Sequence, residues 1–421
     1  MGPVRFTQVA MMNKQIILIA DVAGAAHYHV GDEAILTSRL AWLRREFPTV
    51  EAVAVSEDPV FTARQNGLRA LAEPELPGWA DQAWIYSWRT PALTARYLEI
   101  RSRWSIPSLA LLLRQIRKSV ALVICGGGNL TTPYGRLLRF RSLLAGYAEA
   151  CGVPVVVTGQ QIGPTLTPAE TRILCQWLPH AVLVGVRDTE VSARFGRKLG
   201  VSEHRLIVTG DDALDLDAVR VSAPWIPSKA VGPVIGLSLH NPGQAGQRLE
   251  QLSALASLLG PWLRGTNARV LMLPHLRASV AHRCDVRLAH DFSTACGLAE
   301  QIHVVDSPDY RDVHIKYLTG LCDFIVTTRF HGAVFALTTG VPLMALSHDT
   351  YADSKFNGLF SYFGLDWQAM RVTDPKAVDV LHKAWNQRAK ARVQLDMARQ
   401  TAMTKHGKSQ EKIRLVLERL M

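Results

Sequence analysis

The chain has 421 residues, 48% of them hydrophobic, which is enough for two domains with sizeable cores and argues against global disorder. No apolar run approaches the length of about 18 residues that a membrane-spanning helix needs. Lysine and arginine total 47 against 36 aspartate and glutamate residues, and the net charge of +11 favours anionic partners.

The six cysteines lie far apart, mostly within apolar stretches. They show no CxxC or cysteine–histidine spacing, so we predict buried, reduced thiols and no metal site. The N-terminal residues carry no cleavable signal pattern, because the apolar run at 16–20 is too short and is typical of a first strand. We therefore expect a cytoplasmic protein.

Short apolar segments alternate with helical patterns along the chain. Near-continuous apolar strands separated by helices are typical of parallel sheets covered on both faces, so the expected fold class is α/β. The expected strands are 16–20, 52–55, 121–125, 154–158, 182–186, 206–208, 234–238, 269–273, 303–305, 324–327 and 343–346.

A proline-rich stretch at 223–233 divides the chain into two parts. We predict an N-terminal α/β domain at 1–222, a linker at 223–233, a C-terminal α/β domain at 234–365 and a basic helical tail at 366–421. Two Rossmann-like domains would then face each other across a cleft, which is a preferred place for a ligand.

Positive charge concentrates in segment 96–118 and in the tail. The segment interleaves arginine with leucine and tryptophan, and Pro107 is expected to start a new helix within it. This amphipathic basic pattern could contact an anionic membrane surface, with the protein held peripherally on the inner face of the membrane. The alternative is a surface helix whose apolar side packs on the domain.

The motif Gly31-Asp32-Glu33 follows the first strand and a loop. Gly31 permits a tight turn, Asp32 can cap the following helix, and Glu33 then lies where the helix dipole favours a carboxylate. The functional alternative places Asp32 or Glu33 at the cleft, where a carboxylate binds sugar hydroxyls or acts as a base. The preceding His27 and His29 are weak evidence for a metal, and loop contacts with a substrate are expected instead.

Three consecutive glycines, Gly126, Gly127 and Gly128, precede Asn129 at the end of expected strand 121–125. Their backbone N–H groups could converge on an anion, and the alternative is a tight turn with positive φ. Gln160 follows strand 154–158 in a glycine-rich turn, where a plain turn and a ligand contact are equally expected.

Arg187 and Asp188 follow strand 182–186. Asp188 can cap the next helix, which leaves Arg187 at the strand tip, where it could hold a phosphate or a carboxylate. The alternative is an ion pair of Arg187 with Asp188 or with Asp211, which lies in an acidic turn after strand 206–208.

Arg329 and His331 lie at the tip of strand 324–327, before a small-residue helix that Gly340 ends. Ligands of open α/β sheets bind outside the carboxyl ends of the strands, near helix N-termini. The next strand is followed by three further polar residues, His348, Asp349 and Lys355. A cation and an imidazole in this place predict a pocket for a phosphorylated or carboxylated ligand.

In this order, the motifs resemble the polysaccharide pyruvyltransferase family over residues 15–360. The motifs that carry the resemblance are Gly31-Asp32-Glu33-Ala34-Ile35-Leu36, Gly126-Gly127-Gly128-Asn129-Leu130, Gly159-Gln160-Gln161-Ile162-Gly163-Pro164, Arg187-Asp188 with Ser192, Gly210-Asp211-Asp212-Ala213-Leu214, and Arg329-Phe330-His331-Gly332 running into Gly340-Val341-Pro342. Arg329 and His331 match the family's Arg-x-His motif. Phe330, Gly332 and His348 depart from the residues that the family often has.

The resemblance implies a GT-B-like fold and a transferase of exopolysaccharide biosynthesis. It implies that the pyruvyl group of phosphoenolpyruvate passes to a sugar diol of a polysaccharide or its precursor, lipid-linked or free. The product is a ketal, phosphate is released, and no cofactor is expected.

Under this hypothesis Arg187, Arg329 and the glycine N–H groups hold the phosphate and carboxylate, and His331 protonates the enol methylene carbon. The hydroxyl proton passes to one of three carboxylates, those of Asp32, Glu33 and Asp349. The expected substrate-binding residues are Arg187, Gly126, Gly127, Gly128, Asn129, Gln160, His348, Asp349 and Lys355.

Two other functions stay open at this point. A nucleotide-sugar glycosyltransferase of the same fold would also use a cleft with basic residues. A non-catalytic module would bind a membrane or a polyanion through the basic segment and the tail. No nucleic-acid-binding motif is visible, so a nucleic-acid partner is not expected, and the sequence does not predict the oligomeric state.

Overall fold

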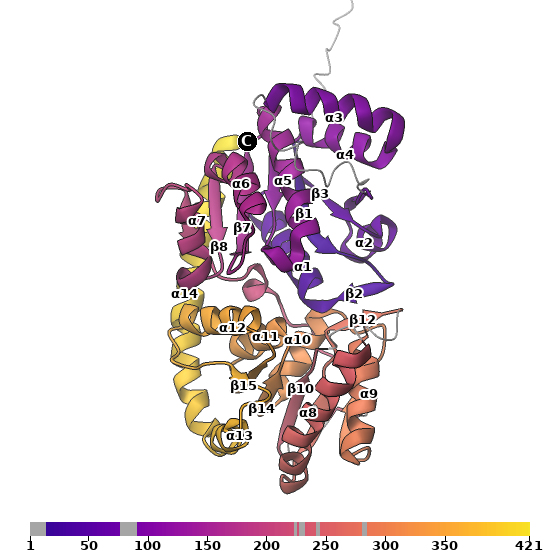
Figure 1. The fold of residues 1–421 in the computed structure, drawn as a ribbon, viewed down its shortest axis with the longest axis vertical. Coiled ribbons are helices and arrows are strands. Elements are labelled where there is room, and N and C mark those ends of the chain that lie inside the picture. Colours follow the sequence, from indigo (N-terminus) through magenta and orange to yellow (C-terminus); the bar gives the residue numbers. More distant parts are fainter. Residues whose placement is uncertain (1–13, 76–90, 223–224, 227–231, 241–244, 280–283) are drawn as a thin grey trace, which may run out of the picture.

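The computed structural model describes residues 14–75, 91–222, 225–226, 232–240, 245–279 and 284–421. It contains two α/β domains stacked end to end, with a long C-terminal helix along one side of both (Figure 1). The expected linker, 223–233, lies mostly outside the described residues.

The N-terminal domain is built on a parallel sheet in the order β4-β3-β1-β5-β7-β8-β9, and β6 also pairs with β7. The strands are β1 (Gln15–Val22), β3 (Glu51–Ser56), β4 (Arg69–Ala72), β5 (Ala121–Ile124), β6 (Gly127–Leu130), β7 (Val155–Ile162), β8 (Leu183–Val186) and β9 (Leu206–Val208). All strands expected in this half of the chain are confirmed, and β4 and β6 are additional members of this sheet.

Helices cover both faces of this sheet, which is why its strands are apolar at nearly every position. On β1, Ile16 and Leu18 belong to one core, whereas Ile17 and Ile19 belong to the other, because successive side chains point to opposite faces. The helices are α1 (Val30–Glu46), α2 (Pro59–Asn66), α3 (Pro91–Ser105), α4 (Pro107–Lys118), α5 (Gly135–Ala150), α6 (Pro168–Trp177) and α7 (Arg194–Lys198). At the start of α6, Thr167 and Glu170 form a capping box.

The C-terminal domain has a parallel sheet in the order β13-β11-β10-β14-β15-β16. Its strands are β10 (Val234–Ser238), β11 (Arg269–Met272), β13 (Ile302–Val304), β14 (Phe324–Thr327), β15 (Leu343–Ser347) and β16 (Met370–Arg371). Of these, β16 is additional to the expected strands. The helices are α8 (Ala245–Gly265), α9 (Asp285–Cys296), α10 (Asp312–Leu321), α11 (Phe330–Thr339), α12 (Thr350–Tyr362) and α13 (Ala377–Asn386).

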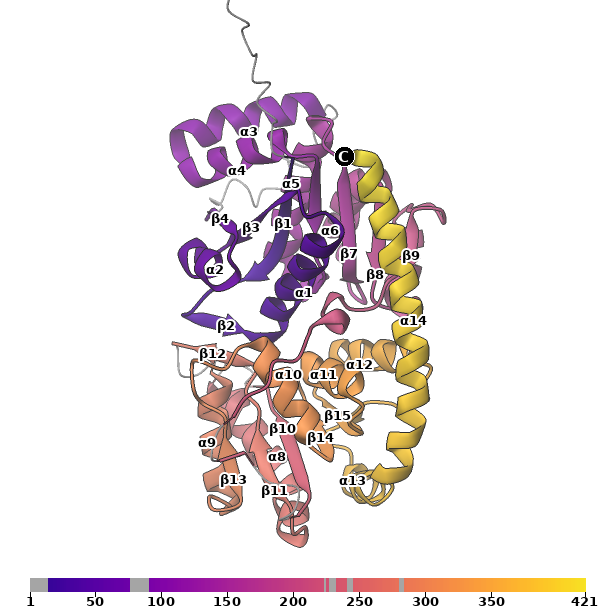
Figure 2. The same ribbon diagram turned by 180° about the vertical axis from the view of Figure 1, so that it is seen from behind.

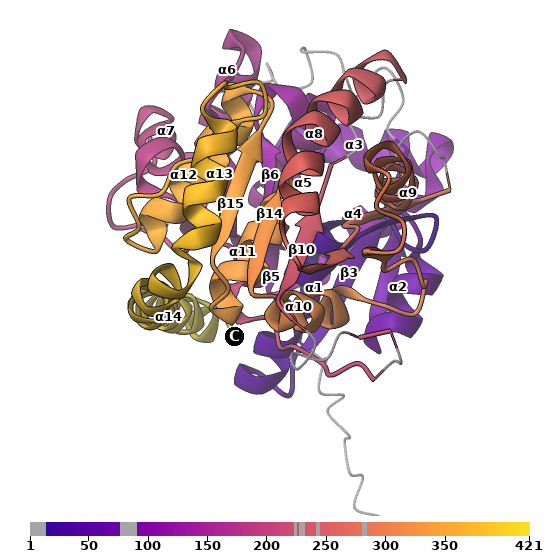
Figure 3. The ribbon, with the colours of Figure 1, turned by 90° about the horizontal axis from the view of Figure 1, so that it is seen from below.

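The two faces of the second sheet have separate cores. Residues of α8, α9 and α13 pack on one face, and residues of α10 and α11 pack on the other. Seen from below, α8 and α13 lie in front of β10, β14 and β15 (Figure 3). The core beneath α10 and α11 also contains residues of α1 and β1 from the N-terminal domain. Apolar packing therefore joins the two domains.

A short antiparallel ladder also joins the domains. Strand β2 (His27–His29) of the N-terminal domain pairs with β12 (Leu276–Ala278) of the C-terminal domain. Behind the ladder, the Tyr28 hydroxyl donates to Asp312 Oδ1 at 3.1 Å. The ladder fixes the position of the chain that enters α1.

The last helix, α14 (Arg388–Leu420), leaves the C-terminal domain and runs back along the N-terminal domain (Figure 2). His406 is fully buried, with its Nδ1 2.7 Å from the Thr209 carbonyl and its Nε2 3.0 Å from Asp215 Oδ2. Gln410 accepts a hydrogen bond from Arg39 at 2.9 Å. The predicted basic tail is therefore helical, but it packs on both domains instead of projecting as an appendage.

The basic segment 96–118 forms α3 and α4, and Pro107 is the first residue of α4 as expected. Helix α4 buries Leu109, Leu112, Leu113 and Ile116 in the core of the N-terminal domain. Its apolar side is thus occupied, which favours the packed surface helix over a free membrane-binding face.

Among the described residues, no helix combines the length and the apolar character that crossing a membrane requires.

The cysteines agree only partly with the prediction of buried thiols. Cys125, Cys296 and Cys322 are buried, whereas Cys175 is exposed and both Cys151 and Cys284 are half-buried. The six cysteines form no disulfide bond. Cys175 is on α6, whose opposite face carries the apolar contacts with the sheet, so its exposure follows from the helical period.

Candidate active site

The carboxyl ends of strands from both sheets meet at the domain interface, and they bring an arginine, an aspartate and a histidine together. Arg187 follows β8, Asp211 follows β9, and His331 lies in the first turn of α11 after β14. His331 Nε2 is 3.5 Å from Asp211 Oδ1, and Arg187 Nη2 is 2.6 Å from Asp211 Oδ2. The exposed fractions are 4% for Arg187, 1% for Asp211 and 6% for His331, so this ion-paired group is buried.

Electrostatics within this group favour an ionised Asp211. Burial alone would raise the pKa of Asp211, but the charges of Arg187 and His331 outweigh burial and hold the pKa well below its usual range. Burial lowers the pKa of His331, and the Asp211 carboxylate opposes that shift. Of the two pairings expected for Arg187, the one with Asp211 is confirmed, whereas Asp188 caps the next helical turn by accepting from Val191 N.

Gly31 has a different role from the predicted one. It lies in the first turn of α1, and a Cβ placed on it would come within 1.9 Å of His331 Nδ1. The prediction of a tight turn is wrong, because the helix already begins at Val30. Only glycine leaves room for the imidazole of the opposite domain, so Gly31 sets the close approach of α1 to α11.

Asp32 is also not the helix cap that was predicted. His29 is the N-cap, and its Nδ1 accepts from Asp32 N at 3.3 Å, because β2 carries the chain directly into the helix. The Asp32 carboxylate lies 3.0 Å from the same Nδ1. Burial would raise the pKa of Asp32, but His29, His331 and Arg187 outweigh it and lower the pKa to about 2.

Glu33 lies in a different environment from Asp32. It is 2% exposed, and its Oε1 has no hydrogen-bond partner among the described residues. Burial and then the neighbouring charges of Asp312 and Asp32 raise the pKa of Glu33 to about 8. Glu33 therefore lies with Asp312 behind the β2–β12 ladder, apart from the contacts of His331.

Arg329 is held by a partner that the sequence did not indicate. Its Nε donates to Asp285 Oδ2 at 2.8 Å and its Nη2 donates to Oδ1 at 2.6 Å. Asp285, the first residue of α9, also accepts from Leu276 N at 2.9 Å. The remaining nitrogen, Nη1, is 3.4 Å from His29 Nε2. Asp285 therefore orients the guanidinium toward the start of α1.

Lys355 lies on α12, against the aromatic residues of the site. Its Nζ is 4.9 Å from the centre of the Phe330 ring and 5.0 Å from that of Tyr351, while Arg187 Cζ is 4.7 Å from the Phe330 ring. Burial, with Arg187 adding to it, lowers the pKa of Lys355 to about 7. The Tyr351 hydroxyl donates to Gly128 O at 2.9 Å, which brings the glycine segment against α12.

The glycine segment is more structural than predicted. Gly127 to Leu130 form β6 rather than a loop, and Gly127 has φ +151°. Gly126 N already donates to Asp212 Oδ2 at 2.8 Å, and Asn129 donates to Asp21. Only Gly128 reaches the site, because a Cβ on it would lie 2.5 Å from Tyr351 Oη and 3.2 Å from Lys355 Nζ.

Gln160, Asp349 and His348, which were also predicted to bind the substrate, each have a protein partner of their own. β7 continues through Gln160, so the expected turn there is wrong, and the buried amide donates to the Cys125 carbonyl. Asp349 caps α12 by accepting from Ala352 N at 2.7 Å. His348 is exposed, with its Nε2 2.7 Å from Gln251 Nε2.

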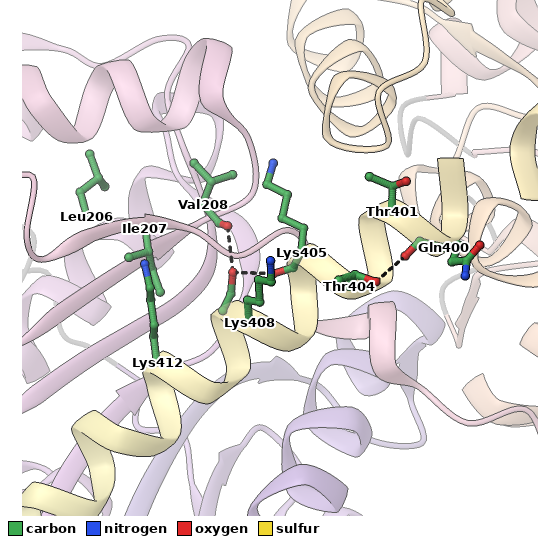
Figure 4. A pocket seen from close by; sticks show the side chains of 10 residues that line it. Leu206, Ile207, Val208, Gln400, Thr401, Thr404, Lys405, Lys408 and Lys412 are labelled. Atoms are coloured by element: carbon green, nitrogen blue, oxygen red, sulfur yellow. Dashed lines mark hydrogen bonds between the residues drawn. The ribbon is translucent and has the colours of Figure 1, made fainter. Parts of the chain in front are cut away.

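A separate hollow lies on the flank of the N-terminal domain, between β9 and α14 (Figure 4). It encloses about 740 Å³. Its lining residues include Lys405, Lys408 and Lys412, but none of the predicted catalytic or substrate-binding residues. We therefore place the candidate site at the domain interface, where the motif residues converge.

Comparison with known proteins identifies the fold. The chain has a TM-score of 0.59 and 12% identity to Staphylococcus aureus MnaA solved with UDP, covering 92% of this chain and 91% of that one. For Anabaena HepE in complex with UDP and glucose, the values are 0.57 and 13%, with coverage of 95% and 99%. For the UDP-GlcNAc 2-epimerase from Neisseria meningitidis bound to UDP-GlcNAc, they are 0.56 and 12%, with 90% and 93%. At this identity the likeness establishes the GT-B-type fold.

Sequence comparison identifies the family. No curated protein matches the chain. Residues 29–350 match the family model for polysaccharide pyruvyl transferase, and this range includes Gly31, Arg187, Asp211, Arg329 and His331. Because the match covers well over half of the 421 residues, the chain belongs to the polysaccharide pyruvyl transferase family.

Proposed function

We propose that the protein transfers the pyruvyl group of phosphoenolpyruvate to two hydroxyls of a sugar in a polysaccharide or its precursor, forming a ketal and releasing phosphate. One observation carries the proposal. Four groups that bind anions or carry protons converge on the domain interface, namely Arg187, Arg329, His331 and Lys355. A donor with a phosphate and a carboxylate matches this charge.

Arg187 and Lys355 are the proposed phosphate ligands. Both approach the ring of Phe330, and Arg187 Nε has no hydrogen-bond partner among the described residues. Arg329 is the proposed carboxylate ligand, because Asp285 occupies only two of its three nitrogens. Guanidinium groups suit both tasks, since they bond oxyanions through paired N–H donors.

His331 is the proposed donor of the proton to the methylene carbon of the enol. Burial lowers its pKa in the free protein, whereas Asp211 and the charges of a bound donor act in the opposite direction. Protonation makes the neighbouring carbon electrophilic, so that a sugar hydroxyl can attack it. A second hydroxyl then displaces phosphate and closes the ketal.

The direct test is incubation of the protein with phosphoenolpyruvate and a panel of glycans, free and lipid-linked. We expect phosphate release that depends on the acceptor, together with an acceptor mass increased by one pyruvyl ketal. Phosphate release without a modified glycan, or no reaction with any acceptor, contradicts the proposal.

A nucleotide-sugar glycosyltransferase is the second candidate. It is favoured by the fold shared with HepE, whose structure contains UDP and glucose. Thermal-shift titration distinguishes the two candidates. Stabilisation by phosphoenolpyruvate and not by UDP-sugars supports the pyruvyl transfer, and the reverse result supports the alternative.

The cellular location of the protein is also a proposal. We infer a cytoplasmic enzyme, in keeping with six cysteines that form no disulfide bond. Peripheral contact with an anionic membrane surface would use the exposed cations of α3 and α4. Flotation with anionic liposomes tests this contact, which should be lost when Arg114 and Arg117 are replaced by glutamine.

A further inference from the structure

The reaction proposed above needs a second group that moves protons. His331 supplies one proton to the methylene carbon, and the attacking hydroxyl must lose a proton to a different group. The sequence suggested that a carboxylate does this. The structure places each of the three candidate carboxylates in an environment that suits the task poorly.

Asp32 is a weak base, because its pKa is lowered to about 2 and its carboxylate is paired with His29 at 3.0 Å. Glu33 lies behind the β2–β12 ladder and is 2% exposed. Asp349 accepts from Ala352 N at 2.7 Å as the cap of α12. Efficient general bases have a pKa near the working pH, which the lowered pKa of Asp32 does not meet, and the Asp349 carboxylate is already engaged as a helix cap.

Lys355 meets the requirement in position and bonding. No hydrogen bond or ion pair joins its Nζ to any residue within the described part of the chain. The amine is held by position instead, between Phe330, Tyr351 and the backbone of Gly128. Gly128 belongs to the N-terminal domain, so the Nζ lies where the two domains meet, beside Phe330, the residue before His331.

The charged and titratable groups that act on Lys355 come from several elements. The cations near it lower its tendency to hold a proton, and the carboxylates raise it. These groups are Arg187 after β8, Asp32 on α1, Asp211 after β9 and Arg329 after β14. Burial acts in the same direction as the cations and is the largest influence, so the pKa falls to about 7.

We propose that Lys355 is the second proton-transfer residue of the site and works opposite His331 in both halves of the reaction. This inference rests on the proposed pyruvyl transfer. It assigns to Lys355 a catalytic role beyond the binding of phosphate.

The protons balance over the two halves. In the first, His331 gives its proton to the methylene carbon, the first hydroxyl oxygen bonds to the neighbouring carbon, and Lys355 takes the hydroxyl proton. In the second, the other hydroxyl oxygen bonds to the same carbon, and the carbon–oxygen bond to phosphate breaks with its electron pair leaving on phosphate. Lys355 gives its proton to the departing phosphate, and His331 takes the proton of the second hydroxyl. Both residues return to their starting states.

Replacing Lys355 with arginine separates charge from proton transfer. Arginine keeps a positive charge and hydrogen-bond donors, but it does not give up a proton at any working pH. We expect Lys355→Arg to bind phosphoenolpyruvate about as well as wild type, measured by calorimetry. Its kcat should fall about 100-fold or more, because general acid–base groups contribute about that much. A kcat within about threefold of wild type overturns the proposal.

The pH profile gives an independent readout. Wild-type kcat/KM should fall on both sides of an optimum, because His331 must hold a proton and Lys355 must lack one when the reaction begins. In Lys355→Arg one of the two limbs should disappear. A profile that keeps both limbs contradicts the proposal.

Two further variants test whether the effect is specific to the site and to proton transfer. Lys408→Arg, in the hollow beside α14, makes the same replacement outside the site and should leave kcat unchanged. Lys355→Ala should regain turnover when small primary amines are added, increasingly as the amines deprotonate. Absence of rescue in a variant that is folded by circular dichroism counts against proton transfer.

The outcomes also separate the two proposals. Wild-type protein that is inactive with phosphoenolpyruvate overturns the pyruvyl transfer and the role of Lys355 together. Active wild-type protein with an equally active Lys355→Arg overturns the role of Lys355 alone.

Discussion

Two arginines lie at strand tips of opposite domains, and their guanidinium groups differ in how they are paired with other residues of the protein. Arg187 is 4% exposed and forms one ion pair, with Asp211 at 2.6 Å, while its Nε has no partner among the described residues. Arg329 is more accessible, and Asp285 accepts two of its hydrogen bonds. Arg187 thus combines a structural charge with an unpartnered Nε, whereas Arg329 is oriented by Asp285 and its third nitrogen has a long contact of 3.4 Å with His29 Nε2.

The largest expected effect follows removal of the more deeply buried arginine. Arg187→Met leaves the Asp211 carboxylate buried without its nearest cation, which should destabilise the protein by about 3–5 kcal/mol. Turnover should be lost as well. Urea unfolding measures the first effect, and an unchanged unfolding midpoint would show that Arg187 is not the main partner of Asp211.

A smaller effect is expected at Arg329, and it should appear in substrate binding. Arg329→Ala removes a charge-assisted contact worth about 1.5–3 kcal/mol, so the KM for phosphoenolpyruvate should rise about 10–100-fold. Asp285→Asn keeps the arginine but loosens its orientation, and should raise the KM by less. If the KM does not rise in Arg329→Ala, Arg329 does not bind the donor.

The contact of the two domains at His331 can be tested through glycine. Gly31→Ala puts a methyl group 1.9 Å from His331 Nδ1, so the imidazole or α1 must move and kcat should fall at least tenfold, about 1.4 kcal/mol in the barrier. Gly407→Ala on α14 is the matched control, because a Cβ there has no neighbour within 4 Å. It should be stabilising by about 0.5–1 kcal/mol with unchanged kcat. Equal behaviour of the two variants contradicts the close approach.

The smallest effect on turnover is expected at Glu33, where the effect is on stability. The pKa of Glu33 in the folded protein, about 8, lies above its value in the unfolded chain. Glu33 therefore contributes fully to the free energy of unfolding at a pH below the unfolded pKa. This contribution is lost as the pH rises toward 8. Glu33→Gln removes this titration. The variant should gain stability relative to wild type between pH 5 and pH 8, measured by thermal unfolding, and a constant difference would contradict the raised pKa.

The sequence was most informative where a local pattern determines the structure. Strand cores such as 16–20 and 324–327 are short apolar runs with turn residues after them, so both the strands and the tips with Arg187 and Arg329 could be predicted. The Gly340 stop of α11 and the Thr167 capping box were predictable for the same reason, because they depend on adjacent residues.

Contacts between distant segments could not be predicted. Asp285 reaches Arg329 across 44 residues, and Tyr351 reaches Gly128 across 223. The cap at α1 was assigned to Asp32 because the pairing of β2 with β12, which starts the helix at Val30, has no signal in the local sequence. Gly126 and Gln160 have polar groups that looked available, but buried partners use them.

The course of α14 has a consequence for how substrates enter. Arg187, Asp211 and His331 are almost fully buried, so we expect the domains to part before a donor can reach them. Helix α14 is hydrogen-bonded to both domains, through Arg399 to the Thr338 carbonyl and through His406 to the Thr209 carbonyl. Thr209 is two residues from Asp211. A hinge motion would therefore pull on the segment that carries Asp211. Replacing His406 with alanine should loosen this tether and change the rate of opening, which hydrogen exchange of residues 209–215 can follow.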